Sequence, residues 1–202
     1  MESAEPGTVR PGGRTARVRA AVLQAAGDEL AAKGLDGLDL AEVAARAGVG
    51  KTTVYRRWGS VAALVADLLA DMAEQSLPRT ETGSLLEDLR ANALLVARTL
   101  NDPRQGRLFR ALIAAATCDE HAAAALHRFY RVRVDEWAPC VEHAITRGEL
   151  PVGTDPREVI RAVSAPLYYR ALTSGDPLDD AATERAARAA LAAAIAGVYL
   201  HT

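Results

Sequence analysis

Apolar positions along the first seventy residues recur at spacings of three and four, which is the period of an amphipathic α-helix. A first helix is predicted to begin at Arg14 and to stop at Gly34, because glycine readily ends a helix. Its inward positions lie four apart: Val18, Val22, Ala26 and Leu30.

Three more helices are predicted to follow within the next forty residues. Asp39 is a cap for the second, with Glu42 placed three residues later as a capping-box partner, and Gly48 ends it. A short third helix spans residues 51–58. Ser60 caps a fourth, whose inward positions are Leu64, Leu68 and Met72.

The remainder of the chain also follows a helical period, after a linker-like stretch at residues 77–83 that reads "LPRTETG". Five helices are predicted, over residues 84–100, 104–117, 120–147, 156–173 and 180–199. Pro139 falls inside the third of these five and is expected to kink or split it, because proline lacks the backbone N–H. No alternating pattern of the kind that strands show is present.

Composition agrees with an all-α protein of about nine helices. Apolar residues make up 50% of the 202 positions, while aromatic residues make up 4%. Alanine and leucine dominate the apolar half, and both favour helices. The pattern divides the chain into a Pro- and Gly-rich arm expected to be disordered (1–13), a small helical module (14–76) and a larger helical body (84–202).

Charge and cysteine content give only weak information about function and compartment. The net charge is −2, yet residues 1–60 hold nine Arg or Lys against seven Asp or Glu, so the amino-terminal end is mildly basic. The two cysteines are too few for a disulfide framework in a chain of this length. No apolar run is long enough to cross a bilayer, and no signal-peptide pattern opens the chain. We therefore expect a cytoplasmic protein that has no membrane partner.

The stretch "GVGKTTVY" at residues 48–55 permits two interpretations. A nucleotide-binding phosphate loop needs glycine, four residues, and then Gly-Lys-Ser/Thr; Gly50, Lys51 and Thr52 supply the second half, but Ala45 occupies the position of the first glycine. Such a loop also follows a buried strand, whereas the sequence here predicts a capped helix. The nucleotide-binding enzyme remains the minor alternative.

A helix-turn-helix fits the same residues at each position. Small residues at 44, 45 and 47 let a second helix cross the first, and Gly48 suits the turn. In the third helix Val54 and Trp58 lie four apart and point inward. The remaining residues of that helix then face mostly outward: Lys51, Thr52, Thr53, Tyr55, Arg56 and Arg57. Threonine can contact base edges, and the tyrosine and basic side chains can hold phosphates.

The segment "LDLAEVAARAGVGKTTVYRRWGSVAALVADLL" resembles the DNA-binding module of the TetR family of bacterial transcriptional regulators. The resemblance covers about residues 14–74. In the body, "RGELPVGTDPREV" and "APLYYRAL" resemble one branch of the family more loosely. The resemblance implies that the outward residues of the third helix contact DNA, and that Arg14 and Arg17 at the start of the first helix contact phosphates.

The last two predicted helices are candidates for a dimer interface. A single helix-turn-helix reads few base pairs, so a homodimer on a near-palindromic operator of double-stranded DNA is expected. The resemblance also implies that these two helices form the dimer interface. The candidate interface residues are Val163, Leu167, Tyr168, Leu191, Ile195 and Val198.

The resemblance further implies a pocket for a small-molecule inducer, enclosed by the helices between residues 84 and 147. Its bulky candidates are Phe109, Leu112, Ile113, Phe129, Tyr130 and Trp137. An inducer that prefers one conformation of the body would release the DNA, which makes a ligand-responsive repressor the expected function. A constitutive DNA-binding protein, in which these side chains only fill a core, is the alternative.

Catalytic and metal-binding signals are weak. Cys118 and His121 form one spaced pair and Cys140 and His143 another, but 22 residues along one helix separate the pairs by roughly 33 Å, too far for a shared zinc ion. No serine-hydrolase elbow, zinc-protease motif or dinucleotide loop is present. We expect no enzyme activity, no metal and no cofactor.

Overall fold

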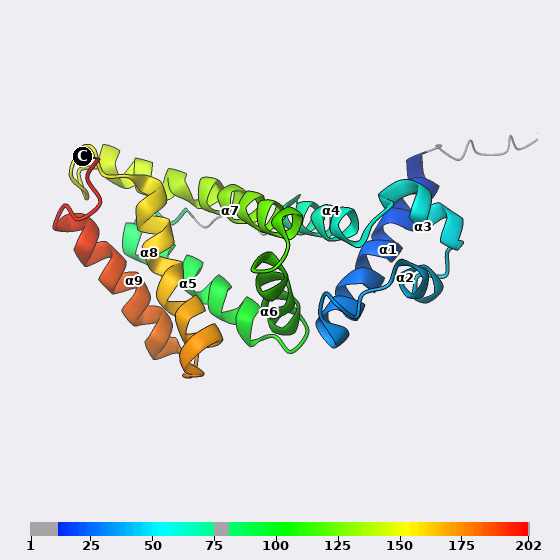
Figure 1. Cartoon of the computed structure of the whole chain (residues 1–202). Coiled ribbons are helices and arrows are strands. Elements are labelled where there is room, and N and C mark those ends of the chain that lie inside the picture. Colours follow the sequence, from blue (N-terminus) through cyan, green and yellow to red (C-terminus); the bar gives the residue numbers. More distant parts are fainter. Residues whose placement is uncertain (1–11, 75–80, 202) are drawn as a thin grey trace, which may run out of the picture.

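The computed structural model describes residues 12–74 and 81–201, with the side chain of Arg14 outside the description. Most of the predicted arm and linker therefore lies outside the described residues. Every named element in the described part is helical. Figure 1 shows two groups of helices, with α1 to α3 at one end of an elongated molecule and α5, α8 and α9 at the other.

The amino-terminal group is built on the apolar stripes that the sequence predicts. Val22 and Leu30 on the first helix, Val43 on the second and Val54 on the third are fully buried. The four helices of this group are α1 (Gly12–Lys33), α2 (Leu40–Arg46), α3 (Lys51–Trp58) and α4 (Val61–Glu74). Because each stripe is one face of a short helix, the four helices can share one small core.

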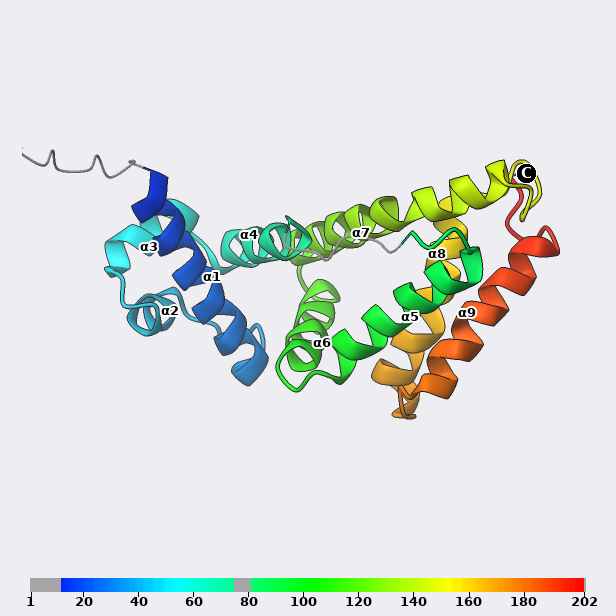
Figure 2. The ribbon, with the colours of Figure 1, turned by 180° about the vertical axis from the view of Figure 1, so that it is seen from behind.

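Long helices form the body and join it to the amino-terminal group. In both views α4 lies against the amino-terminal part of α7, while α6 stands next to the carboxyl end of α1 (Figures 1 and 2). Arg90 on α5 pairs with Glu184 on α9 at 2.5 Å. The body helices are α5 (Leu85–Asn101), α6 (Gln105–Ala116), α7 (Glu120–Thr146), α8 (Pro156–Tyr169) and α9 (Asp180–Ile195).

Several predicted helix boundaries are wrong. The first helix already begins at Gly12, and α7 runs without interruption through Pro139. The predicted helix 156–173 ends as an α-helix at Tyr169 and continues as a π-helical turn, η1 (Arg170–Ser174). The last helix stops at Ile195 and not at residue 199, because Gly197 adopts the left-handed conformation (φ 78°) that ends helices.

Local caps follow the sequence with one exception. Asp39 caps α2 by accepting hydrogen bonds from the backbone N–H groups of Ala41 and Glu42. The Glu42 carboxylate does not complete a capping box; it pairs with Lys33 at 2.6 Å. No helix in the described residues is long and apolar enough to span a membrane.

Candidate nucleic-acid interface

The turn between α2 and α3 has the geometry of a helix-turn-helix. Gly48 occupies the left-handed region (φ 67°), which glycine adopts without strain. The backbone N–H of Val49 then donates to the carbonyl of Ala44 at 3.0 Å, which folds the chain back across α2. Ala44 is fully buried, so its small side chain allows this close approach. The glycine-rich stretch therefore leads out of a helix, and the strand that a nucleotide-binding loop needs is replaced by α2.

Helix α3 presents the predicted two faces. Val54 and Trp58 are buried, whereas Lys51, Arg56 and the half-exposed Tyr55 face solvent. Thr52 and Arg57 are also exposed, while Thr53 is partly buried. The outward face thus carries hydroxyls near its amino-terminal end and positive charges at both ends.

Trp58 fixes the orientation of this helix through a carboxylate. Its indole Nε1 donates to Asp67 on α4 at 2.9 Å, and Asp67 also accepts from Arg19 Nη2 on α1 at 2.7 Å. Partial burial raises the pKa of Asp67, but the hydrogen bonds from Arg19 and Trp58 outweigh this and lower it. Arg57 lies over the Trp58 ring, 5.1 Å from its centroid, at a cation–π distance. Sequence reasoning missed the Arg19–Asp67 contact, since it joins residues 48 positions apart.

Basic side chains on α3 differ from those elsewhere in the amino-terminal group. Arg19, Lys33 and Arg46 each pair with a carboxylate. Within residues 12–74 and 81–201, by contrast, Lys51 and Arg56 form no ion pair, which leaves their charges for an external anion. The surface of α3 is therefore suited to bind phosphates.

Arginines at the start of α1 were the other predicted contacts. Arg17 is exposed, and its Nε donates to the carbonyl of Gly13 at 3.2 Å. Arg14 belongs to α1, but its side chain lies outside the described residues. The DNA contacts of both residues, like those of α3, stay predictions.

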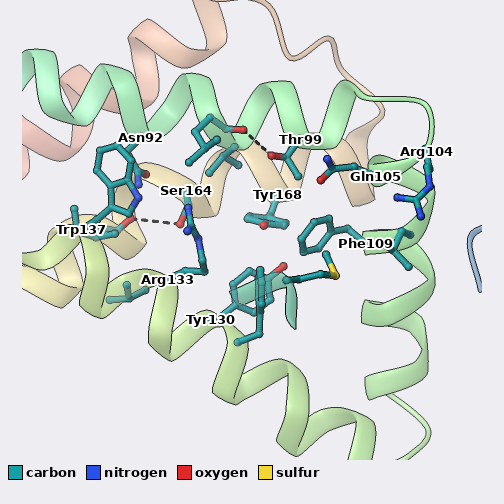
Figure 3. A pocket seen from close by; sticks show the side chains of 17 residues that line it. Asn92, Thr99, Arg104, Gln105, Phe109, Tyr130, Arg133, Trp137, Ser164 and Tyr168 are labelled. Carbon is teal, nitrogen blue, oxygen red and sulfur yellow. Dashed lines mark hydrogen bonds between the residues drawn. The ribbon is translucent and has the colours of Figure 1, made fainter. Parts of the chain in front are cut away.

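The body encloses a cavity of about 350 Å³ between α4, α5, α6, α7 and α8. Four predicted residues line it: Phe109, Phe129, Tyr130 and Trp137 (Figure 3). Leu112 and Ile113 do not line it, which corrects the prediction; Leu112 is instead packed in the core with 1% exposure. Sequence reasoning missed the polar part of the lining, including Asn92, Arg104, Arg133 and Ser164.

The predicted dimer residues fall into two sets. Val163 and Leu167 are fully buried within their own chain, so their side chains cannot form a surface, and Tyr168 lines the cavity. The prediction that these three side chains form the dimer surface is therefore wrong. Ile195 and Val198 are exposed at 56% and 66%, while Leu191 is partly buried.

Two further large exposed apolar side chains, which sequence reasoning missed, lie at the other end of the α8 and α9 pair. Tyr169 is 61% exposed at the end of α8, and Leu172 in η1 is 41% exposed. Their helical spacing from the buried Val163 and Leu167 could have shown that they face the opposite way.

The paired cysteines and histidines do not meet. Cys118 is exposed at the end of α6, while Cys140 is buried in α7. In the part of the chain that the structure describes, no group of three or more His, Cys, Asp and Glu side chains could hold a metal ion.

These features define a helix-turn-helix DNA-binding protein with a separate cavity-containing body. A family model described as "Bacterial regulatory proteins, tetR family" matches residues 22–68, and one described as "Tetracyclin repressor-like, C-terminal domain" matches residues 79–190. The chain belongs to the TetR family of bacterial transcriptional regulators.

Similar proteins agree with this assignment. The HTH-type transcriptional regulator YdeS of Bacillus subtilis is 35% identical over 79% of this chain and 81% of its own. The DNA-binding transcriptional repressor TetR of Mycobacteroides abscessus is 34% identical over 80% of this chain and 85% of its own. The crystal structure of the TetR family regulator SCO0332 superimposes with a TM-score of 0.70 at 30% identity, covering 87% of this chain and 97% of that one. The protein is thus a DNA-binding transcriptional regulator.

Proposed function

We propose that the protein is a homodimeric repressor that binds a palindromic operator through α3 and leaves it when a small molecule enters the body. The observation that carries the proposal is the outward face of α3, whose Lys51 and Arg56 have no carboxylate partner among the described residues. The anchoring of Trp58 to Asp67 supports a fixed presentation of that face. The relative named a DNA-binding transcriptional repressor supports repression over activation.

A dimer is needed because one recognition helix contacts only a few base pairs. Exposed apolar side chains lie at both ends of the α8 and α9 pair, with Tyr169 and Leu172 at one end and Ile195 and Val198 at the other. Helices α8 and α9 belong to the group remote from α3 (Figure 1). Pairing these side chains across a twofold axis would bury them and hold two α3 helices apart, at about 34 Å for successive major grooves. We expect the dimer to act in the cytoplasm, where bacterial DNA is found.

Release by a ligand is supported by the cavity, which a constitutive DNA-binding protein would not require. Arg104 borders the cavity, and its Nε pairs with Asp28 of α1 at 2.6 Å. Asp28 also lies 3.8 Å from Arg46 of α2. Cavity and DNA-binding module are thereby connected through one carboxylate, so a ligand that moves Arg104 acts on α1 directly.

The test is selection of bound fragments from bacterial genomic DNA, followed by titration of the recovered site at several salt concentrations. We expect one near-palindromic site. Arg56→Ala should weaken its binding and flatten the plot of log K against log salt by about two units per dimer, one phosphate contact per protomer.

Arg185→Ala is the matched control, because Arg185 is an exposed arginine on α9, far from α3. It should leave both affinity and salt slope unchanged. Equal effects of the two substitutions, or failure to enrich any site, would contradict the proposal.

A further inference from the structure

The cavity contains buried polar atoms without hydrogen-bond partners. Trp137 is 2% exposed and Asn92 is 5% exposed. Within residues 12–74 and 81–201 neither the Trp137 Nε1 donor nor the Asn92 Oδ1 acceptor has a hydrogen-bond partner. A buried polar group without a hydrogen-bond partner destabilises a protein, so such atoms in a cavity indicate a bound molecule that supplies the missing hydrogen bonds.

These polar atoms lie at one end of an elongated cavity. The Tyr130 and Tyr168 rings contact edge to face, with centroids 5.5 Å apart, which aligns α7 and α8 at that level. Trp137 lies seven residues along α7 from Tyr130, which is about 11 Å on a helix. Ile160 of α8 lines the cavity together with Trp137. Figure 3 shows Asn92, Trp137 and Arg133 on one side of the view and Phe109 on the other.

Flat apolar rings surround the opposite end. Phe109 and Phe129 have ring centroids 5.6 Å apart, and Phe129 meets Tyr130 at 5.3 Å. Burial raises the pKa of Tyr130 far above its usual range, so its hydroxyl stays neutral at physiological pH. This end suits an aromatic body, since rings pack favourably edge to face.

The charges around the cavity are balanced. Two arginines line it, but Arg133 pairs with Glu136 at 2.7 Å and Arg104 pairs with Asp28. Glu136 and Asp28 are not part of the lining, and no Asp or Glu side chain is found in it. A cationic ligand would therefore have no counter-ion, and an anionic one would face arginines that are already paired. A neutral molecule avoids both costs.

We propose that the cavity binds a neutral, elongated, mostly aromatic molecule with an amide-like polar end. Its carbonyl accepts a hydrogen bond from Trp137 Nε1, its N–H donates to Asn92 Oδ1, and its rings lie between the aromatic side chains. The identity of this molecule as the inducer rests on the proposed function, whereas its binding does not.

The test uses the full-length protein without DNA and four probes that share a biphenyl body. Biphenyl-4-carboxamide carries the neutral amide, biphenyl-4-carboxylate an anion, 4-phenylbenzylamine a cation, and 4-methylbiphenyl no polar group. Affinities are measured by titration calorimetry. We expect the carboxamide to bind at least about tenfold more tightly than each of the other three. Equal or tighter binding of the carboxylate or amine, or no measurable binding of the carboxamide, would overturn the inference.

Two variants locate the polar contact. Trp137→Phe keeps a ring but removes the N–H, so it should reduce the preference for carboxamide over 4-methylbiphenyl to less than about threefold. Phe109→Leu alters the other end and should weaken both probes while keeping their ratio. An unchanged ratio in Trp137→Phe would also overturn the inference.

DNA release is measured separately from binding. If the carboxamide binds as expected but leaves the operator complex intact, the ligand class stands and the inducer function fails. If operator binding itself is absent, only the proposed function is refuted.

Discussion

Asp67 connects three helices of the DNA-binding module, so its removal tests how α3 is held. It accepts the indole N–H of Trp58 at 2.9 Å and two guanidinium N–H groups of Arg19, at 3.2 Å from Nε and 2.7 Å from Nη2. Asp67→Ala removes all of these acceptors at once. Trp58 is 8% exposed, so its N–H would lose its partner in a nearly dry position.

The loss in free energy of unfolding on Asp67→Ala can be worked out from the two contacts that Asp67 makes, the indole hydrogen bond and the ion pair. A hydrogen bond to a charged group contributes about 1.5–3 kcal/mol, and the indole bond is of this kind. The Arg19–Asp67 pair is partly solvent-exposed, with side-chain exposures of 23% and 27%, so it adds less than about 1 kcal/mol. We therefore expect Asp67→Ala to lower the free energy of unfolding of the module by about 2–3 kcal/mol.

The assay is urea unfolding followed by tryptophan fluorescence in a Trp137→Phe background. The chain has two tryptophans, so Trp58 alone then reports on the module. Protomer concentration is held fixed because dimerisation contributes to apparent stability. Glu74→Ala, an exposed change on the same helix, is the control and should stay within about 0.5 kcal/mol.

A double-mutant cycle separates the indole contact from the ion pair. Combining Asp67→Ala with Trp58→Phe, with unfolding of all four proteins followed by helical circular dichroism, should give a coupling energy of at least about 1 kcal/mol. A loss below about 0.5 kcal/mol for Asp67→Ala, or a coupling near zero, would refute the view that Asp67 anchors α3.

Three further outcomes are expected. The pKa of Asp67 is lowered in the folded state, so the stabilisation that its carboxylate provides is present above the unfolded pKa near 4 and is lost as pH falls through the folded pKa. When the pH is lowered from 5 to 2, the urea midpoint should therefore fall more steeply for the native protein than for Asp67→Ala. Tyr169→Glu should convert the dimer to monomer in sedimentation velocity while keeping its helical circular dichroism, and an intact dimer would contradict the proposed interface. Ser164→Phe should fill the cavity and abolish calorimetric binding of biphenyl-4-carboxamide but change operator affinity less than about threefold. Among the described residues, the Ser164 hydroxyl donates only to carbonyls of its own helix.

Helical periodicity predicts most of the fold because most of the buried apolar side chains lie on amphipathic helices; Leu38, Leu150 and Leu178 are core residues in connecting segments. The phase of α3 was fixed by two residues, Val54 and Trp58, and this alone was enough to separate its inward and outward faces. Boundaries were harder to predict where apolar residues continue past a stop. Val198 extended the last predicted helix beyond Gly197, although the glycine is what ends it.

The cavity was only partly predictable. Bulky aromatic residues could be recognised as candidates from their size, but Asn92 and Arg133 gave no signal, since their role depends on how three distant helices pack. Tyr168 was predicted for the dimer surface because it continues an apolar stripe. In the structure its ring instead contacts Tyr130, and the next residue, Tyr169, takes the outward position.

Residues that line the cavity are connected to the DNA-binding module at two places, one on α4 and one on α1. Met72 of α4 lines the cavity five residues, about 7.5 Å, from Asp67, the acceptor for Trp58. A helix is stiff over that length, so a ligand that displaces Met72 also displaces the anchor of α3. Arg104 acts on α1 through Asp28 at a different place. A ligand in the cavity would therefore act on the DNA-binding module through two separate helices, α4 and α1.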